Sequence, residues 1–209
     1  MDMNGGLKMN NAIYMGAFET REVEGPGEIE GRAIVFDTAT DLGFFDEVID
    51  RHALDNADLR DVRLCLNHDT SFVYARSRNN NENSTMQLRI TDEGMDIRAN
   101  LDVENSPLAQ SFKSAIDRRD IDKMSFMFVV SREEWTDIDS EHPTRIIREI
   151  SRVLEVSAVT FPAYDTTFIK ARSLADALDS ARASLESAKA EAREVERKKQ
   201  RIRILTEVK

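Results

Sequence analysis

Residues 123–131 read K-M-S-F-M-F-V-V-S, a pattern that favours a β-rich fold. Its aromatic and β-branched residues are typical of a strand, and its nearly continuous apolar character predicts burial. Ser125 interrupts the apolar run, and on a strand its side chain shares a face with Met127 and Val129. A buried hydroxyl costs stability unless it is hydrogen-bonded, so Ser125 is either a backbone-bonded structural serine or a functional one.

Shorter strand patterns lie on both sides of this stretch. We predict strands at residues 28–36, 61–68, 85–90, 94–103, 145–150 and 153–160. The turn T-D-E-G at residues 91–94 joins two of them into a hairpin. Because the strands are short and mostly hairpin-linked, we predict a mainly β, α+β domain with a curled or closed antiparallel sheet.

Two helices are predicted within this domain. Ser106 and Pro107 mark the start of the first, which ends near Arg119. Its apolar face consists of Leu108, Phe112, Ala115 and Ile116. The second is a short helix after Asp50, whose side chain is a suitable N-cap.

The last 39 residues are a different kind of chain, because all glycines, prolines and aromatic residues precede residue 171. Apolar and small residues recur there at alternating spacings of four and three, which predicts one long helix with a weak coiled-coil seam. The seam is weak because three of its positions are alanine and one is lysine; its residues are Leu174, Leu178, Ala181, Leu185, Ala188, Ala192, Val195, Lys199 and Ile202. This helix either is solvated or packed on its own domain, or docks on a partner helix. We therefore divide the chain into a disordered start (1–11), a main domain (12–170) and a helical tail (171–209).

Charge and composition exclude several functions. The net charge is −10, and it combines −13 in residues 1–170 with +3 in residues 171–209. This acidity argues against nucleic-acid binding. No apolar run is long enough to span a membrane, the N-terminus has no signal-peptide pattern, and the single Cys65 rules out a disulfide framework.

Three residues on separate strands have the chemistry of a hydrolase. His68 ends an apolar strand, whereas His52 and His142 lie in polar surroundings. Glu155 interrupts the apolar strand at 153–160 and is either at a rim or paired. Ser125, His68 and Glu155 together supply a nucleophile, a base and a carboxylate, as Ser-His-acid catalysis requires.

Two other kinds of site are poorly supported. No second His or Cys stands at metal-ligand spacing from His68, so we expect no metal and no cofactor. Cys65 precedes His68 by three residues and would face the opposite side of a strand, which argues against a Cys-His pair.

Five spaced motifs resemble the prohead (capsid-maturation) serine proteases of tailed bacteriophages. They are G-R-A-I-V-F, D-E-V-I-D-R-H-A-L, L-N-H-D, K-M-S-F-M-F and L-E-V-S-A-V-T-F-P-A-Y-D, in the family's order across residues 28–170. The resemblance implies a fold similar to that of the herpesvirus assembly proteases, a small closed β-barrel flanked by helices. It makes residues 12–170 the protease domain.

The resemblance also implies roles for individual residues. His68 of L-N-H-D is the general base, and Ser125 of M-S-F is the nucleophile. The E-V-S segment matches the strand that carries the third catalytic residue, which places Glu155 in that role. Glu149 and Asp69 are its rivals. The backbone N–H groups of Ala163 and Tyr164 are the candidates for the oxyanion hole.

The implied function is that of an endopeptidase. It would cleave the scaffolding segment and the major capsid protein, and also itself, inside the prohead in the host cytoplasm, acting as a homodimer. The alternative is a non-catalytic assembly protein that uses the same barrel and tail to join the shell.

Overall fold

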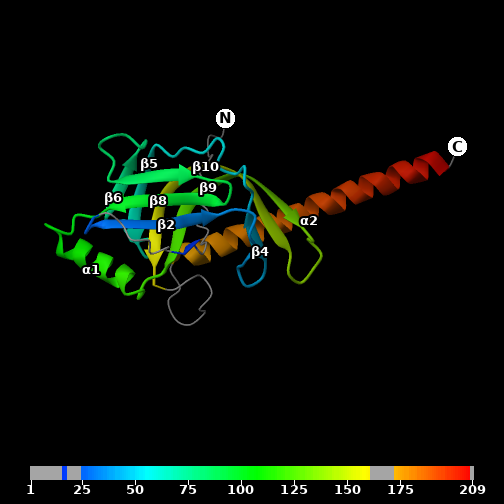
Figure 1. Ribbon diagram of the computed structural model, residues 1–209. Coiled ribbons are helices and arrows are strands. Elements are labelled where there is room, and N and C mark those ends of the chain that lie inside the picture. Colours follow the sequence, from blue (N-terminus) through cyan, green and yellow to red (C-terminus); the bar gives the residue numbers. More distant parts are fainter. Residues whose placement is uncertain (1–15, 18–24, 161–171, 208–209) are drawn as a thin grey trace, which may run out of the picture.

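The computed structural model describes residues 16–17, 25–160 and 172–207, which form a mainly β body and two helices (Figure 1). The predicted disordered start and the predicted boundary at residue 171 lie outside these residues. The helices are α1 (Pro107–Asp117) and α2 (Arg172–Glu207). The strands are β1 (Gly16–Ala17), β2 (Glu28–Val35), β3 (Thr40–Asp41), β4 (Asp46–Ile49), β5 (Asp61–Leu66), β6 (Ala75–Arg78), β7 (Met86–Ile90), β8 (Gly94–Asn100), β9 (Lys123–Thr136) and β10 (Thr144–Val159).

The 16-residue strand β10 organises the larger of the two sheets. On one side it pairs with β9 in an antiparallel hairpin, which extends beyond the apolar stretch 123–131 into polar residues as far as Thr136. On its other side β4 pairs with residues 144–147 and β5 pairs with residues 155–158, and both run parallel to β10. The predicted antiparallel sheet is therefore wrong in this respect. Strands β4 and β5 reach β10 through long connections rather than hairpins, so nothing forces them to be antiparallel.

Strands β2, β8 and β7 form a second, antiparallel sheet, in which the predicted turn at residues 91–94 joins β7 to β8. The ladders of the described residues thus define two sheets and not a closed ring. The core lies between the sheets and includes Ile34, Met95, Phe126 and Val156. A closed barrel stays a prediction.

Helix α1 begins as predicted, with the Ser106 side chain accepting the Ala109 N–H at 3.2 Å and Pro107 in the first turn. Phe112 and Ile116 are buried against the core. Leu108 was predicted on that face but is 52% exposed, because Ala109 takes the buried position one residue later.

The predicted short helix after Asp50 is wrong. Residues 51–56 form turns, although Ala53 and Leu54 are buried as apolar anchors. The Asp50 carboxylate accepts the N–H of His52, two residues on, at 2.9 Å. This bond is the one that an N-cap makes, but the backbone bonds that follow join residues three apart, such as Ala53 N–H to the Asp50 carbonyl at 2.8 Å, so the segment forms successive turns and no α-helix.

The beginning of the described part of α2 packs on the far end of the β9–β10 hairpin. Ala181 and Leu185 are buried there, and the Trp135 indole N–H donates to the Ser184 hydroxyl at 3.0 Å. Ser184 in turn donates to Glu133 on the same strand as Trp135. The Arg182 guanidinium lies over the Phe44 ring, 4.8 Å from its centre.

Beyond residue 189 the helix leaves the body of the protein. Residues 190–203 are all exposed, and Figure 1 shows this part of α2 projecting away from both sheets. One part of the helix is therefore packed on its own domain and the other is solvated, and docking on a partner helix stays a prediction. No helix in the described part of the chain is both long enough and apolar enough to cross a membrane.

Candidate active site

Strands β9, β10 and β5 lie side by side and bring the polar residues of three strands together. Ser125 is directly opposite Ser157 in the antiparallel β9–β10 ladder. Ser157 is in turn level with Cys65 in the parallel β10–β5 ladder. Residues at matching positions of adjacent strands face the same side of a sheet, and Glu155 faces that side too because it is two residues from Ser157.

His68 joins this group through an unusual backbone. Strand β5 ends at Leu66, and Asn67 and His68 have φ values of 52° and 60°, in the left-handed region. The alternation of a strand therefore stops before His68, and the sequence-based argument about which way it faces is wrong. The imidazole lies on the side of Cys65 and Glu155.

The imidazole of His68 is hydrogen-bonded to Glu155. Nδ1 lies 2.6 Å from Oε1, and the side chains are 13% and 1% exposed. An ionised carboxylate only accepts hydrogen bonds, so Nδ1 carries a proton in this pair. In a neutral ring Nε2 then presents its lone pair, which is the tautomer that a general base needs.

Ser157 closes a ring of hydrogen bonds around this pair. Its hydroxyl donates to Oε2 of Glu155 at 2.5 Å and accepts the backbone N–H of His68 at 3.1 Å. Ser157 is not among the site residues predicted from the sequence. The same signal that drew attention to Glu155 marks it, since both are polar residues two positions apart in an apolar strand.

Two buried polar atoms of the group have no hydrogen-bond partner among the described residues: the hydroxyl oxygen of Ser125 and Nε2 of His68. Buried polar atoms are nearly always satisfied, so an orphaned pair needs an explanation. The two atoms are therefore not hydrogen-bonded to each other in the described structure. Contacts between a nucleophile and its base often tighten only when substrate binds, and polar groups waiting for a substrate are one explanation of such vacancies.

The rivals of Glu155 are engaged elsewhere. The exposed Asp69 carboxylate accepts the Ser71 N–H at 2.9 Å, and this bond lowers its pKa. Glu149 forms an ion pair with Arg132 at 3.7 Å. Neither is hydrogen-bonded to His68 in the described part of the chain. The oxyanion-hole candidates Ala163 and Tyr164 lie outside the described residues.

Cys65 is fully buried beside this group and does not act as a nucleophile near neutral pH. Burial, followed by the nearby negative charge of Glu155, raises the pKa of its thiol to about 12. The nucleophile in thiol chemistry is the thiolate, which is scarce at such a pKa. Cys65 therefore packs the wall of the site.

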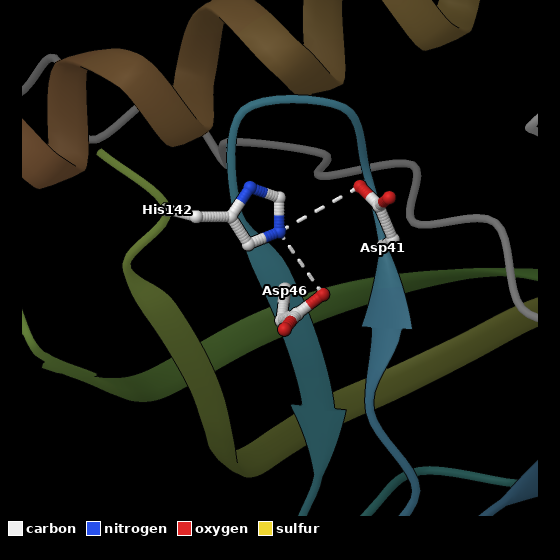
Figure 2. A group of neighbouring side chains, drawn as sticks. All are labelled: Asp41, Asp46 and His142. Atoms are coloured by element: carbon white, nitrogen blue, oxygen red, sulfur yellow. Dashed lines mark hydrogen bonds and ion pairs between the residues drawn. The ribbon is translucent and has the colours of Figure 1, made fainter. Parts of the chain in front are cut away.

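A second group of titratable side chains lies near the other end of β10. Figure 2 shows the His142 imidazole between Asp41 and Asp46, with Nε2 at 3.7 Å and 3.2 Å from the two carboxylates. Their ligand atoms lie within 4.8 Å of one another, a spacing that can hold a cation. Asp46 pairs with Thr144 on β10, roughly 35 Å along that strand from Glu155. The three side chains are 33–64% exposed and form ordinary surface contacts, far from the group around Glu155.

The fold and the group around His68 and Glu155 together define a class of protein. A serine hydroxyl, an imidazole and a carboxylate, supplied by adjacent strands and the turn after one of them, are the residue types of a hydrolase with a serine nucleophile.

The chain belongs to the caudovirus prohead serine proteases, because the model of that family matches residues 16–180. This membership confirms the resemblance seen in the sequence motifs. It makes the protein a serine protease with a role in capsid maturation inside the prohead. The comparisons with curated proteins and with solved structures returned no match.

Proposed function

We propose that this protein is a Ser-His-Glu endopeptidase that cleaves the scaffolding segment and the major capsid protein, and also itself, inside the prohead. Ser125 is the nucleophile, His68 the general base and Glu155 the residue that orients the imidazole. The observation that carries this assignment is the arrangement of His68. Its Nδ1 is bound to Glu155, while its Nε2 and the Ser125 hydroxyl are buried and have no hydrogen-bond partner among the residues that the structure describes.

The reaction is a two-step acyl transfer. The Ser125 oxygen attacks the scissile carbonyl as His68 Nε2 takes the hydroxyl proton, and Glu155 stabilises the imidazolium that forms. Collapse of the tetrahedral intermediate breaks the C–N bond, and the imidazolium gives its proton to the leaving amine. Water then attacks the acyl-enzyme with the same base, which releases the new carboxyl group and restores Ser125.

The proposed partners follow from the family and from the tail. Capsid and scaffolding proteins are the substrates, and the projecting part of α2 holds the protease to scaffold helices in the assembling shell, in the host cytoplasm. A homodimer and a sheet curled into a closed barrel belong to the same proposal, as in the herpesvirus assembly proteases that the motifs resemble. Nucleic acid and membranes are not proposed as partners.

The test is substitution of Ser125 with alanine. Ser125→Ala should lower cleavage of capsid protein, and self-cleavage, by more than about 1,000-fold, because the nucleophile is lost. Ser131→Ala is the matched control, since Ser131 is an exposed serine on the same strand whose hydroxyl binds a backbone carbonyl. Circular dichroism should show an intact fold for both.

A fluorophosphonate probe gives a second readout that does not need the natural substrate. The probe loses fluoride and leaves a phosphonyl adduct on an activated serine, which mass spectrometry locates. We expect the adduct on Ser125 in the native chain and no adduct in Ser125→Ala. Normal cleavage by Ser125→Ala would refute the assignment, and a chain with neither cleavage nor adduct would point to the non-catalytic assembly protein.

A further inference from the structure

We propose that Ser157 is a positioning residue of this active site, whose hydroxyl holds the Glu155 carboxylate and the main chain of His68 in one arrangement. The inference rests on the proposed roles of Ser125, His68 and Glu155. It adds a fourth side chain, which touches neither the substrate nor the transferred proton.

The first argument concerns the buried carboxylate. Glu155 is 1% exposed and has no ion pair with Lys or Arg in the described part of the chain. Each of its oxygens has one side-chain donor, His68 for Oε1 and Ser157 for Oε2. A buried charge without hydrogen bonds is costly, so removing the Ser157 hydroxyl leaves Oε2 without a donor and the carboxylate free to turn.

The second argument concerns the backbone of His68. A left-handed conformation is unfavourable for a residue with a side chain and persists only where the surroundings hold it. Two contacts with β10 hold this turn: the Asn67 N–H donates to the Ala158 carbonyl at 2.9 Å, and the His68 N–H donates to the Ser157 hydroxyl at 3.1 Å. Ser157 therefore fixes the same histidine at its main chain and, through Glu155, at its ring.

The third argument separates Ser157 from the nucleophile. Ser157 and Ser125 are opposite each other on neighbouring strands, and both are fully buried. The Ser157 hydroxyl already donates a hydrogen bond to Glu155 and accepts a hydrogen bond from the His68 backbone N–H. Within the described part of the chain the Ser125 hydroxyl has neither contact, so of the two serines it is the one whose proton is available to His68 Nε2.

The experiment compares Ser157→Ala with Ser157→Cys. Cysteine keeps the shape of serine, but its thiol is a weak donor and a weak acceptor. Ser157→Cys therefore weakens the hydrogen bonds without leaving the gap that Ser157→Ala leaves. We expect both variants to lower kcat for a capsid-derived peptide by about 10- to 100-fold with little change in KM. Ser151→Ala is the control on the same strand, because the Ser151 hydroxyl donates to the Val129 carbonyl and contacts neither Glu155 nor His68 among the described residues. Its kcat should match that of the native chain.

Proton NMR provides a readout that a merely structural role would not move. The chain has three histidines, and His52 and His142 are exposed. The Nδ1 proton of His68 is protected from solvent and bound to a carboxylate. It should therefore give the one slowly exchanging imidazole resonance at low field. In a Ser125→Ala background, which prevents self-cleavage, adding Ser157→Cys should shift or broaden this resonance, whereas adding Ser151→Ala should not.

The outcomes distinguish this inference from the proposed function. Native kcat in Ser157→Cys, with inactive Ser125→Ala and Glu155→Gln, would overturn the role of Ser157 and leave the triad in place. Native activity in Ser125→Ala would overturn the triad itself. If Ser157→Ala does not fold, Ser157→Cys and its NMR spectrum decide, and an unmoved resonance in that variant refutes the proposal.

Discussion

At the residue scale, the position of the base depends on two consecutive left-handed residues, Asn67 and His68. Strand β5 ends at Leu66, just before these two residues. If the strand had continued, its alternation would have pointed the imidazole away from Glu155. The Asn67 side chain adds to this turn, since its carbonyl oxygen accepts the backbone N–H of Thr160 at 2.9 Å. Asparagine tolerates the left-handed region better than most residues, which makes it suitable for the first of the two positions.

Glu155→Gln tests the charge of the proposed triad at nearly constant shape. The glutamine oxygen can still accept from Nδ1, but the negative charge that stabilises the imidazolium is lost. We expect kcat/KM for a capsid-derived peptide to fall by about 1,000- to 10,000-fold. The rival Glu149 gives the matched control, because Glu149→Gln removes a carboxylate on the same strand that contacts Arg132. A native rate for Glu155→Gln with a loss for Glu149→Gln would move the third role to Glu149.

The sequence predicts these residues unequally, for a physical reason. Ser125 and Glu155 stand out because a polar residue in an apolar strand must be paired or functional. Ser157 carries the same signal in the E-V-S segment. The orientation of His68 could not be predicted, because the left-handed turn before it depends on contacts with β10, which comes about 90 residues later.

At the scale of elements, β10 connects the active site to the tail. Its last part carries Glu155 and Ser157, while its first part carries Arg145, whose buried guanidinium binds Glu47 at 2.8 Å and Glu133 at 2.9 Å. Glu133 in turn accepts the Ser184 hydroxyl of α2. One strand therefore supports both the proposed catalytic group and the surface on which the helix packs.

Ala181→Asp should detach the packed part of α2 from the β9–β10 hairpin. Ala181 is 1% exposed, so an aspartate there buries an unpaired charge or forces the helix away, at a cost of about 1 to 3 kcal/mol. Ala183→Asp places the same residue two positions away on the exposed side. Hydrogen exchange of residues 178–189 should rise in the first variant only. Equal protection in both would show that this packing is not what holds the helix.

The elements differ in how far local sequence determines them. Helix α1 could be predicted because its N-cap and proline are local signals, and α2 because its apolar spacing continues over many turns. The direction of β4 and β5 could not be predicted, because a strand's pattern is the same in parallel and antiparallel pairs. The extension of β9 to Thr136 was also missed, since its outer half is polar and is stabilised by pairing with β10.

At the scale of the whole molecule, charge is divided along the helix as well as between domain and tail. Residues 171–190 carry three basic and three acidic side chains, so the whole excess of +3 lies in residues 191–209. The exposed part of α2 is therefore the basic part. Such a segment attracts acidic surfaces, and the attraction weakens as salt rises.

Truncation after Ala190 tests whether this projecting part recruits the protease to the prohead. The shortened chain keeps Ala181, Ser184 and Leu185, so its thermal stability and its kcat/KM for a short peptide should equal those of the full chain. Its incorporation into assembling proheads, measured as protease copies per purified particle, should fall at least about tenfold, because the basic segment is gone. The control is a full-length chain with Arg197, Lys198 and Lys199 changed to glutamine, which keeps the helix and removes positive charge. If the truncated chain is incorporated normally, recruitment belongs to the folded body. If only the truncation impairs incorporation and the charge variant does not, the partner recognises the apolar seam of the helix instead of its charge.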